Sequence, residues 1–199
     1  MKPIDDLLYH VLPFAPECPE PTAIHHLREA ARTFCRRTRA WREQYAGTAT
    51  SPVVLVVPDG AQLFEIEDAW FNDCRLERRP VRDLLDYPSD TAGNPNWVAE
   101  AGPASIQLFP FEAGPLRVSM FLEPSPLADE LPDFLVDEHG RTLADGALAD
   151  LLMIPNQPWS NPQLASGFGQ RFSAQADRFF ATNMRGKQRA PVRSRANWL

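Results

Sequence analysis

The chain has 199 residues, enough for one domain with a buried core or for one domain that carries an insertion. Its 20 basic and 26 acidic residues give a net charge of −6, and 44% of its residues are hydrophobic. This composition predicts a soluble globular protein and excludes collagen, a coiled-coil rod and a disulfide-rich miniprotein.

Three irregularly spaced cysteines predict free thiols in a reducing compartment. Neither a signal peptide nor the apolar run of roughly 18 residues that spans a bilayer is found, so export and membrane insertion are not expected.

The charge is distributed unevenly along the chain. Residues 1–177 contain all 26 acidic residues and 14 of the 20 basic ones, a net charge of −12, whereas residues 178–199 carry +6. Residues 185–199 have too few apolar side chains to fold alone, and they end in Trp198 and Leu199. We therefore predict an acidic body followed by an extended basic C-terminal arm at residues 185–199.

Proline shows where long helices can form, because it removes a helical hydrogen bond and clashes with the preceding turn. It accounts for 20 of the 199 residues, about twice the usual ~5%. Three long windows lack it: residues 22–51, 133–154 and 163–190. In the first window, apolar side chains recur at spacings of three and four from Ala23 to Tyr45, which predicts one long amphipathic helix.

Further helices are expected from start and stop signals. Asn161 and Pro162 are typical of a helix start, with a capping residue followed by proline. The stretch that ends before Pro155 is apolar on nearly all sides, which predicts a central buried helix in which Gly146 and Ala147 permit close packing. The predicted helices span residues 4–11, 22–45, 132–154 and 162–184.

Residues 52–124 are predicted to form a β-rich insertion, since their apolar period is 2 rather than 3.6. Asn72 and Asp73 predict a two-residue turn between a pair of strands. A second hairpin is expected at residues 106–122, and residues 80–104 are expected to form one helical turn and then a loop. The predicted strands span residues 53–57, 63–71, 74–78, 106–108 and 116–122.

The order of these elements predicts an α+β fold, because helices and strands are segregated along the chain rather than alternating. We expect mainly a helical bundle of three long helices and a short N-terminal one, with an inserted small antiparallel β-sheet and an extended C-terminal arm. Residues 1–184 are expected to form a single domain.

Signatures of catalysis, nucleotide binding and metal binding are missing from the sequence. There is no glycine-rich phosphate loop, no HExxH or Cys/His zinc spacing and no GxSxG nucleophile motif. No cofactor and no metal is therefore expected, and the acidic residues between 123 and 150 are interpreted as a solvated face. A small cytoplasmic enzyme is the alternative hypothesis, with an unrecognised site in loop 80–104, where Asp83, Asp86, Tyr87 and Trp97 cluster.

The helix predicted over residues 22–45 carries a basic face. Six arginines against two glutamates give this segment a charge of +4 in an otherwise acidic body. The face could meet phosphate, an acidic partner or neighbouring carboxylates, and we favour an acidic surface because no DNA-reading motif is visible. The arginines predicted to make this contact are Arg28, Arg32, Arg36 and Arg39.

Six short segments, spread over nearly the whole chain, carry a family resemblance. They are residues 4–8, 18–21, 34–41, 131–135, 146–153 and 155–162. In their layout they resemble the head-to-tail adaptor, or connector, proteins of tailed bacteriophages. The resemblance implies a non-enzymatic structural protein of the virion neck, synthesised in the cytoplasm of the host bacterium.

The resemblance also implies partners. Proteins of this family form a homo-oligomeric ring, commonly a dodecamer, that lies beneath the portal protein, faces a tail or nozzle protein and lets genomic DNA pass without sequence-specific binding or any membrane. Ring closure would bring the basic helix face to Asp133, Asp137 and Glu138 of the next subunit. The arm would dock on the portal through Arg185, Lys187, Arg189, Arg193, Arg195, Trp198 and Leu199. Another neck component, such as a stopper or tail-completion protein, is a further alternative.

Overall fold

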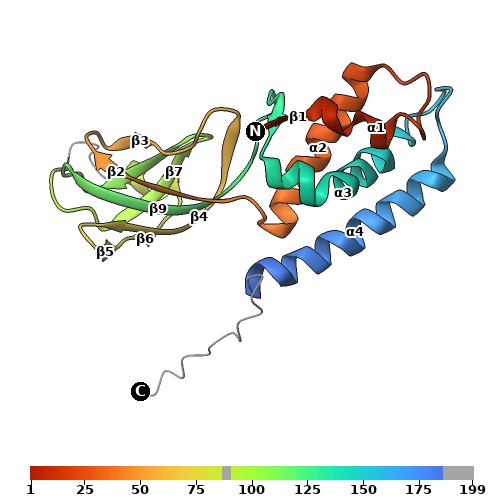
Figure 1. The fold of residues 1–199 in the computed structure, drawn as a ribbon. Helices are drawn as coiled ribbons and strands as arrows, with labels where there is room; N and C mark the ends of the chain where they lie inside the picture. The colour runs from red at the N-terminus through yellow and green to blue at the C-terminus, as the bar shows by residue number, and fades with distance from the viewer. Residues whose placement is uncertain (87–90, 186–199) are drawn as a thin grey trace. The chain divides into compact units, whose positions relative to one another are not determined.

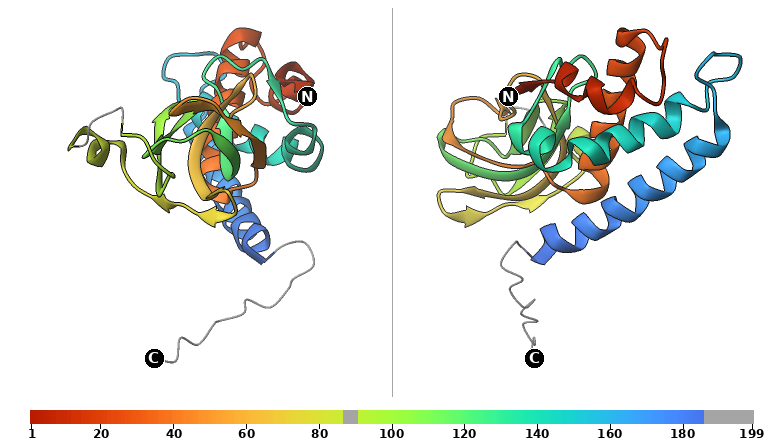
Figure 2. Two further views of the ribbon diagram at one scale, coloured as in Figure 1. Left: turned by 90° about the vertical axis from the view of Figure 1, so that its left-hand side faces the viewer. Right: turned by 45° about the vertical axis from the view of Figure 1, so that its right-hand side comes forward.

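The computed structural model describes residues 1–86 and 91–185 (Figures 1 and 2). Its contacts divide the chain into two compact units. The first, which we call the β unit, comprises Met1–Ile4 and Trp41–Asp133; the second, the helical unit, comprises Asp5–Ala40 and Phe134–Leu199. That residues 1–184 act as a single adaptor domain stays a prediction.

The predicted fold class is wrong in its balance of helix and strand. The chain is 39% helical and 31% strand, and it contains three multi-strand sheets, so it is not mainly a helical bundle of three long helices. The described strands also do not form one small antiparallel sheet, because β6 and β7 pair in parallel. Strand pairing joins segments far apart in sequence, and local periodicity does not reveal it.

Two four-stranded sheets form most of the β unit. The first sheet has the order β2-β9-β4-β5 and the second the order β3-β8-β7-β6, while β1 pairs with β10. The strands are β1 (Lys2–Pro3), β2 (Arg42–Ala49), β3 (Val53–Leu55), β4 (Ala61–Phe71), β5 (Cys74–Arg75), β6 (Glu77–Arg78), β7 (Trp97–Gly102), β8 (Ser105–Phe109), β9 (Gly114–Pro124) and β10 (Glu130–Leu131). A helical turn, η2 (Val81–Asp86), follows β6. Alternate residues of β9 are buried, and they form the core of the unit together with Ile106 and Leu108 of β8.

The two predicted hairpins have different outcomes. The turn at Asn72 and Asp73 is confirmed: Phe71 pairs with Cys74, and both turn residues have positive φ angles of 49° and 62°. The hairpin at residues 106–122 is wrong, because β8 pairs with β3 and β7 whereas β9 pairs with β2 and β4. The predicted loop 80–104 is also wrong in part, since β7 lies within it.

Helix α2 (Glu20–Thr38) ends seven residues before the predicted end at residue 45. Arg39 adopts the left-handed conformation with φ 52°, and its N–H donates to the carbonyl of Cys35 at 2.8 Å, which terminates the helix. The following residues form strand β2 and pair with β9 along their whole length. Trp41, one of the apolar residues at spacings of three and four, is buried. It is not helical, and its carbonyl accepts a hydrogen bond from the N–H of Leu122 in β9.

The helical unit consists of a helical turn and four α-helices among the described residues. They are η1 (Ile4–Leu7), α1 (Leu8–Val11), α2, α3 (Asp133–Leu151) and α4 (Pro162–Arg185). As predicted, Asn161 caps α4: its Oδ1 accepts the N–H of Leu164 at 3.1 Å. Helices α2, α3 and α4 lie side by side (Figure 1). A Cβ at Gly146 of α3 would lie 2.9 Å from the Phe172 ring and 3.1 Å from the Ala30 Cβ, so glycine allows this close packing.

Candidate functional site

The predicted basic face lies on α2, but its arginines already have partners within the chain. Arg32 forms an ion pair with Glu29 one turn earlier, at 3.0 Å. Arg28, Arg36 and Arg39 also interact with other groups of the protein. The face is therefore partly neutralised before any partner binds, and its role in subunit contact stays a prediction.

Arg37, which the sequence analysis did not select, links α2 to α4. Its guanidinium pairs with Asp177 at 2.9 Å and donates to the Ser173 hydroxyl at 3.2 Å. Both partners are exposed, so the pair is worth at most about 1 kcal/mol. Its main effect is to orient the outer face of α2 against α4. No sequence signal identifies this pair, because its two members are 140 residues apart.

The predicted acidic contacts are located at the start of α3. Asp133 forms an ion pair with the N-terminal ammonium of Met1 at 3.0 Å, and its side chain is 60% exposed. Asp137 and Glu138 are exposed on the next turn and interact with other groups of the chain. These carboxylates therefore lie on an accessible surface, as a subunit contact requires. Their contact with a second copy stays a prediction.

Most of the predicted portal-docking arm lies outside the described residues. Arg185 is the last residue of α4. The other six positions, Lys187, Arg189, Arg193, Arg195, Trp198 and Leu199, belong to residues 186–199, which the structure does not describe. Their role stays a prediction.

Two candidate residues of the alternative enzyme, Asp83 and Trp97, have described surroundings. Trp97 is a core residue: it packs on Phe109 with ring centroids 4.8 Å apart, and the Arg79 guanidinium lies 4.5 Å from its ring centre. Asp83 lies 3.5 Å from the neighbouring Arg82. Tyr87 and the side chain of Asp86 lie outside the described part. The aromatic member of this cluster therefore has a structural explanation.

Asp145 is a buried carboxyl of the helical unit whose pKa is shifted by its surroundings. It is buried on α3, and its Oδ1 accepts a hydrogen bond from Arg171 of α4 at 2.7 Å. Burial raises the pKa of Asp145, and the positive charges of Arg171 and Arg141 oppose this shift. Burial, followed by the charge of Arg141, lowers the pKa of His10. The cluster ties α3 to α4 and makes the stability of this unit depend on pH.

The pH dependence of Asp145 has a definite sign. A carboxyl whose folded pKa exceeds its unfolded value of about 3.9 stabilises the fold below that value, and the contribution disappears as pH rises through the folded pKa. We expect the free energy of unfolding of the wild type, relative to Asp145→Asn, to fall as pH rises from about 3.5 to 7. Urea denaturation across this range measures the difference. Asp150→Asn, at an exposed position of the same helix, is the control, and a difference independent of pH would contradict the assignment.

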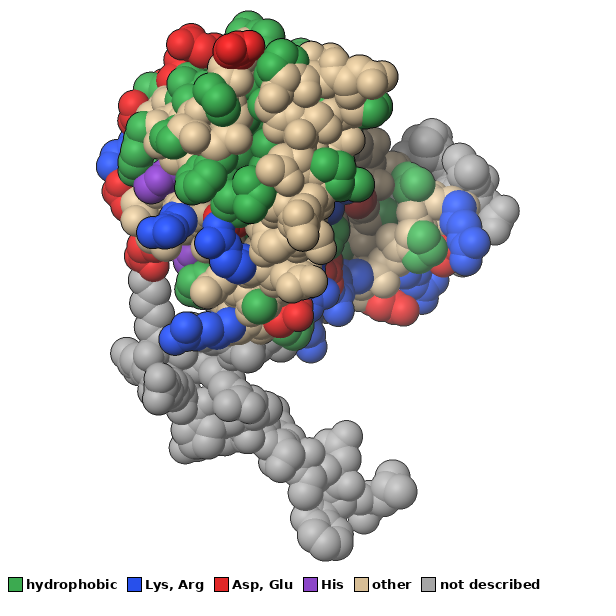
Figure 3. Space-filling view, turned by 90° about the vertical axis from the view of Figure 1, so that its right-hand side faces the viewer, with side chains coloured by type: hydrophobic (Ala, Val, Ile, Leu, Met, Phe, Trp, Pro, Cys, Tyr) green, Lys and Arg blue, Asp and Glu red, His purple; other side chains and the backbone are tan. Residues whose placement is uncertain are grey.

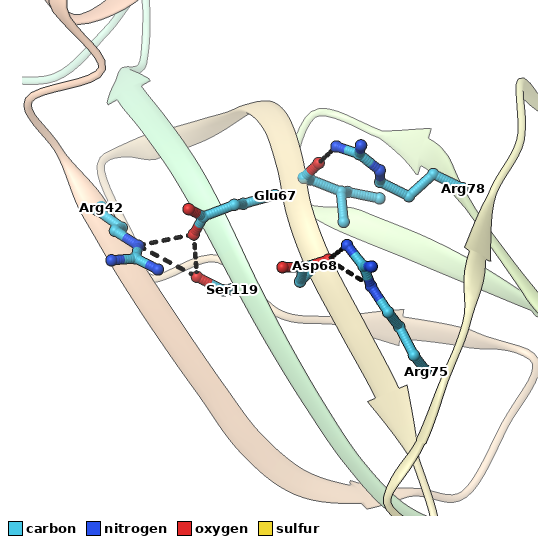
Figure 4. A network of polar contacts seen from close by, with 7 residues as sticks. Arg42, Glu67, Asp68, Arg75, Arg78 and Ser119 are labelled. Atoms are coloured by element: carbon cyan, nitrogen blue, oxygen red, sulfur yellow. Dashed lines mark hydrogen bonds and ion pairs between the residues drawn. The ribbon is translucent and has the colours of Figure 1, made fainter. Parts of the chain in front are cut away.

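A network of charged side chains joins the strands of the β unit (Figure 4). Arg42 of β2, Glu67 of β4 and Ser119 of β9 point toward one another, with Arg42 Nε 2.7 Å from Glu67 Oε2. Arg75 pairs with Asp68, and Arg78 donates to the carbonyl of Ile66 at 2.7 Å. These arginines are held by groups of the same unit, so the network fixes strand β4 against its neighbours.

The helical unit also exposes large apolar side chains. Figure 3 shows apolar side chains gathered on one face of the molecule, among tan and charged groups. Phe14 is exposed yet packs edge-on against Phe168 of α4, with ring centroids 5.2 Å apart. Exposed apolar surface of this kind is typical of protein interaction surfaces. The exposed large apolar residues of this unit include Tyr9, Phe14, Met153, Leu164 and Phe180.

Among the described residues, no group of three or more His, Cys, Asp or Glu side chains could hold a metal ion. Cys18 and Cys35 are buried and Cys74 is exposed, and all three are free thiols. None of the helices within residues 1–86 and 91–185 has the length and apolar character needed to cross a membrane.

The described surface of the helical unit thus combines charged pairs on α2, exposed carboxylates on α3 and exposed apolar side chains. The chain matches the family model of the SU10 adaptor protein over residues 5–195, and it belongs to this family of phage head-to-tail adaptors. The resemblance predicted from the sequence is thereby confirmed. No curated protein matches the chain. The protein is a structural adaptor of a bacteriophage.

Proposed function

We propose that the protein forms a homo-oligomeric ring in the neck of the phage particle, where it joins the portal to the tail and extends the DNA channel. The observation that carries the proposal is the family match over residues 5–195. The exposed apolar and charged surfaces of the helical unit support it, because a ring subunit must contact two neighbours and two further proteins. Twelve copies is the number that the resemblance favours.

Ring closure is proposed to place the basic face of α2 against the acidic start of α3 in the next subunit. Such a contact is heterologous, and it closes into a ring if the rotation between subunits permits. The arginines involved have partners within the chain, but a guanidinium has five N–H donors and can be shared between two carboxylates. The candidate pairs are drawn from Arg28, Arg32, Arg36 and Arg39 on one side and Asp133, Asp137 and Glu138 on the other.

The charge of the body supports a conduit for DNA rather than a DNA-binding protein. Residues 1–177 carry a net charge of −12, and an acidic wall repels the phosphate backbone. Genomic DNA would therefore slide past without sequence-specific binding. The basic arm at residues 185–199 is proposed to dock on the portal, while the opposite end of the ring contacts a tail or nozzle protein.

Cryo-electron microscopy of the neck in purified virions tests the proposal. We expect a closed ring of density between portal and tail into which the β unit and the helical unit of each copy fit separately. Absence of the chain from the neck, or its presence in isolated single copies, would refute the proposal. A monomer in solution is compatible with it, since the portal can template ring assembly.

A further inference from the structure

A groove of about 690 Å³ lies within the β unit, between the two four-stranded sheets. One wall is formed by residues 64–66 of β4, and the other by Val98 and residues 100–102 of β7. Arg78, Arg79, Pro80 and Val81 complete its lining. A volume of this size is in the range of ligand-binding clefts. We call it the β4–β7 groove.

The walls of the β4–β7 groove are strand edges that other strands cover only in part. On the side away from β9, β4 pairs with β5 at Trp70 and Phe71, and the Ala69 carbonyl accepts the N–H of Leu76 at 2.9 Å. On the side away from β8, β7 pairs with β6 at Trp97 and Val98, and the Val98 carbonyl accepts the N–H of Arg79 at 3.0 Å. Leu63 of β4 donates its N–H to the carbonyl of Pro103, in the turn after β7, at 2.7 Å. An extended segment can add backbone hydrogen bonds along the part of either edge that these contacts do not cover.

The chemistry of the groove favours an extended segment that is both apolar and basic. Ile66 and Val98 provide apolar lining, and Val81, 45% exposed, provides more at its margin. Its two arginines already have acceptors, because Arg78 donates to the Ile66 carbonyl and Arg79 pairs with a glutamate. The cations of the groove are thus committed to groups of the β unit.

Two carboxylates line the groove, Glu65 and Glu100, and Glu100 is the one that a basic segment is expected to meet. Within the described part of the chain this carboxylate has neither an ion-pair nor a hydrogen-bond partner. Burial, and then the negative charge of Glu123, raise the pKa of Glu100, which shows that negative charge here is poorly compensated. A lysine or arginine side chain beside Glu100 would supply the missing opposite charge.

We propose that the β4–β7 groove binds the basic C-terminal segment, residues 186–199, of a second copy of this chain. The segment carries Lys187, Arg189, Arg193 and Arg195 without any acidic residue, and it intersperses them with Ala190, Pro191 and Val192. Fully extended at about 3.3 Å per residue, a segment of this length reaches roughly 45 Å.

Such an exchange gives each subunit one donor segment and one acceptor groove, which is the arrangement that a heterologous ring needs. The inference rests on the proposed oligomer, but it assigns a contact that the proposed function does not contain. Residues 187–195 would then occupy the groove instead of the portal, so that the portal contact of the arm would fall to Arg185, Trp198 and Leu199.

Fluorescence anisotropy with a labelled peptide of residues 185–199 and the full-length protein tests the groove. We expect saturable binding that weakens with salt and becomes about tenfold weaker in Glu100→Gln, because a hydrogen-bonded charge pair is lost. The matched control is Asp59→Asn, an exposed acid of the same unit that does not line the groove, and it should bind like the wild type. Equal affinity of Glu100→Gln and wild type, or no binding at all, overturns the proposal.

Mixing two variant chains shows which copy supplies the segment. Both carry Cys74→Ser to remove the exposed thiol. One carries Ala101→Cys with an affinity tag, at a lining position that leaves Glu100 in place, and the other carries Ala190→Cys with a second tag, which keeps every basic residue of the segment. We expect oxidation with diamide to yield a covalent dimer that carries both tags. Absence of a dimer that carries both tags, at concentrations at which the labelled peptide binds, would overturn the role of the second copy. The peptide and mixing experiments use no portal and no virion, so their failure would leave the proposed neck function standing.

Discussion

Replacing Phe34 with alanine is expected to lower the free energy of unfolding by about 3–5 kcal/mol. Phe34 is fully buried on α2, and it lies 4.9 Å from His139 of α3 and 6.0 Å from Phe179 of α4, measured between ring centroids. Phe172 of α4 is a further ring neighbour, at 6.4 Å. Truncation therefore leaves a cavity among the three long helices, and rigid helices collapse only partly around it.

The measurement is urea denaturation followed by far-ultraviolet circular dichroism, which reports the helices directly. Phe180→Ala is the matched control, because this phenylalanine lies in the same unit and its side chain is 39% exposed. We expect the control to lose less than about 1 kcal/mol. Similar losses in the two variants would show that Phe34 does not occupy the centre of the helical core.

The helices could be predicted from the sequence wherever their signals are local. Asn161 and Pro162 stand next to each other and mark the start of α4, and the structure has the capping hydrogen bond there. The turn at Asn72 and Asp73 is local in the same sense, since two adjacent residues determine its geometry. In each case the interaction that decides the structure joins residues no more than three positions apart.

The β structure could not be predicted in the same way. Spacings of three and four continue through Thr38, Trp41 and Tyr45, yet only Thr38 is helical. Arg39 breaks the helix, and pairing with β9 stabilises residues 42–49 as a strand; β9 lies some seventy positions further along the chain. Tertiary pairing overrides a helical pattern in such a case, and the same effect makes a strand of residues 97–102, which were predicted as loop.

The candidate contacts show the same limit. Sequence analysis could identify the arginines of α2 as a basic face, because charge and helical period are local properties. It could not identify Asp177 as the partner of Arg37, or the groove beside Glu100, because each depends on segments that meet only in the folded chain. The family resemblance rests on six short sequence segments, each of which is local, and the family match confirms it.

Deleting residues 185–199 is expected to abolish stable attachment to the portal and to leave both units folded. Among the described residues, the last buried apolar side chain is Ala176, so the deletion removes no described part of the core. It does remove five of the six basic residues that follow Asp177, together with Trp198 and Leu199. Co-sedimentation with portal rings of the same phage measures attachment, and circular dichroism checks the fold. Attachment of the truncated protein with wild-type affinity would refute the role of the arm.

Two further variants separate the parts of the arm. Trp198→Ala combined with Leu199→Ala keeps every arm charge, and we expect it to lose portal attachment while retaining its affinity for the groove. Arg193→Glu combined with Arg195→Glu keeps the apolar end, and we expect the corresponding peptide to lose binding to the protein, because two like charges then face Glu100. If both variants impair portal attachment equally and neither changes peptide binding, the arm acts only on the portal. If the Trp198 and Leu199 substitutions impair only portal attachment, and the Arg193 and Arg195 substitutions impair peptide binding, the result supports an arm that crosses a neighbouring subunit before it reaches the portal.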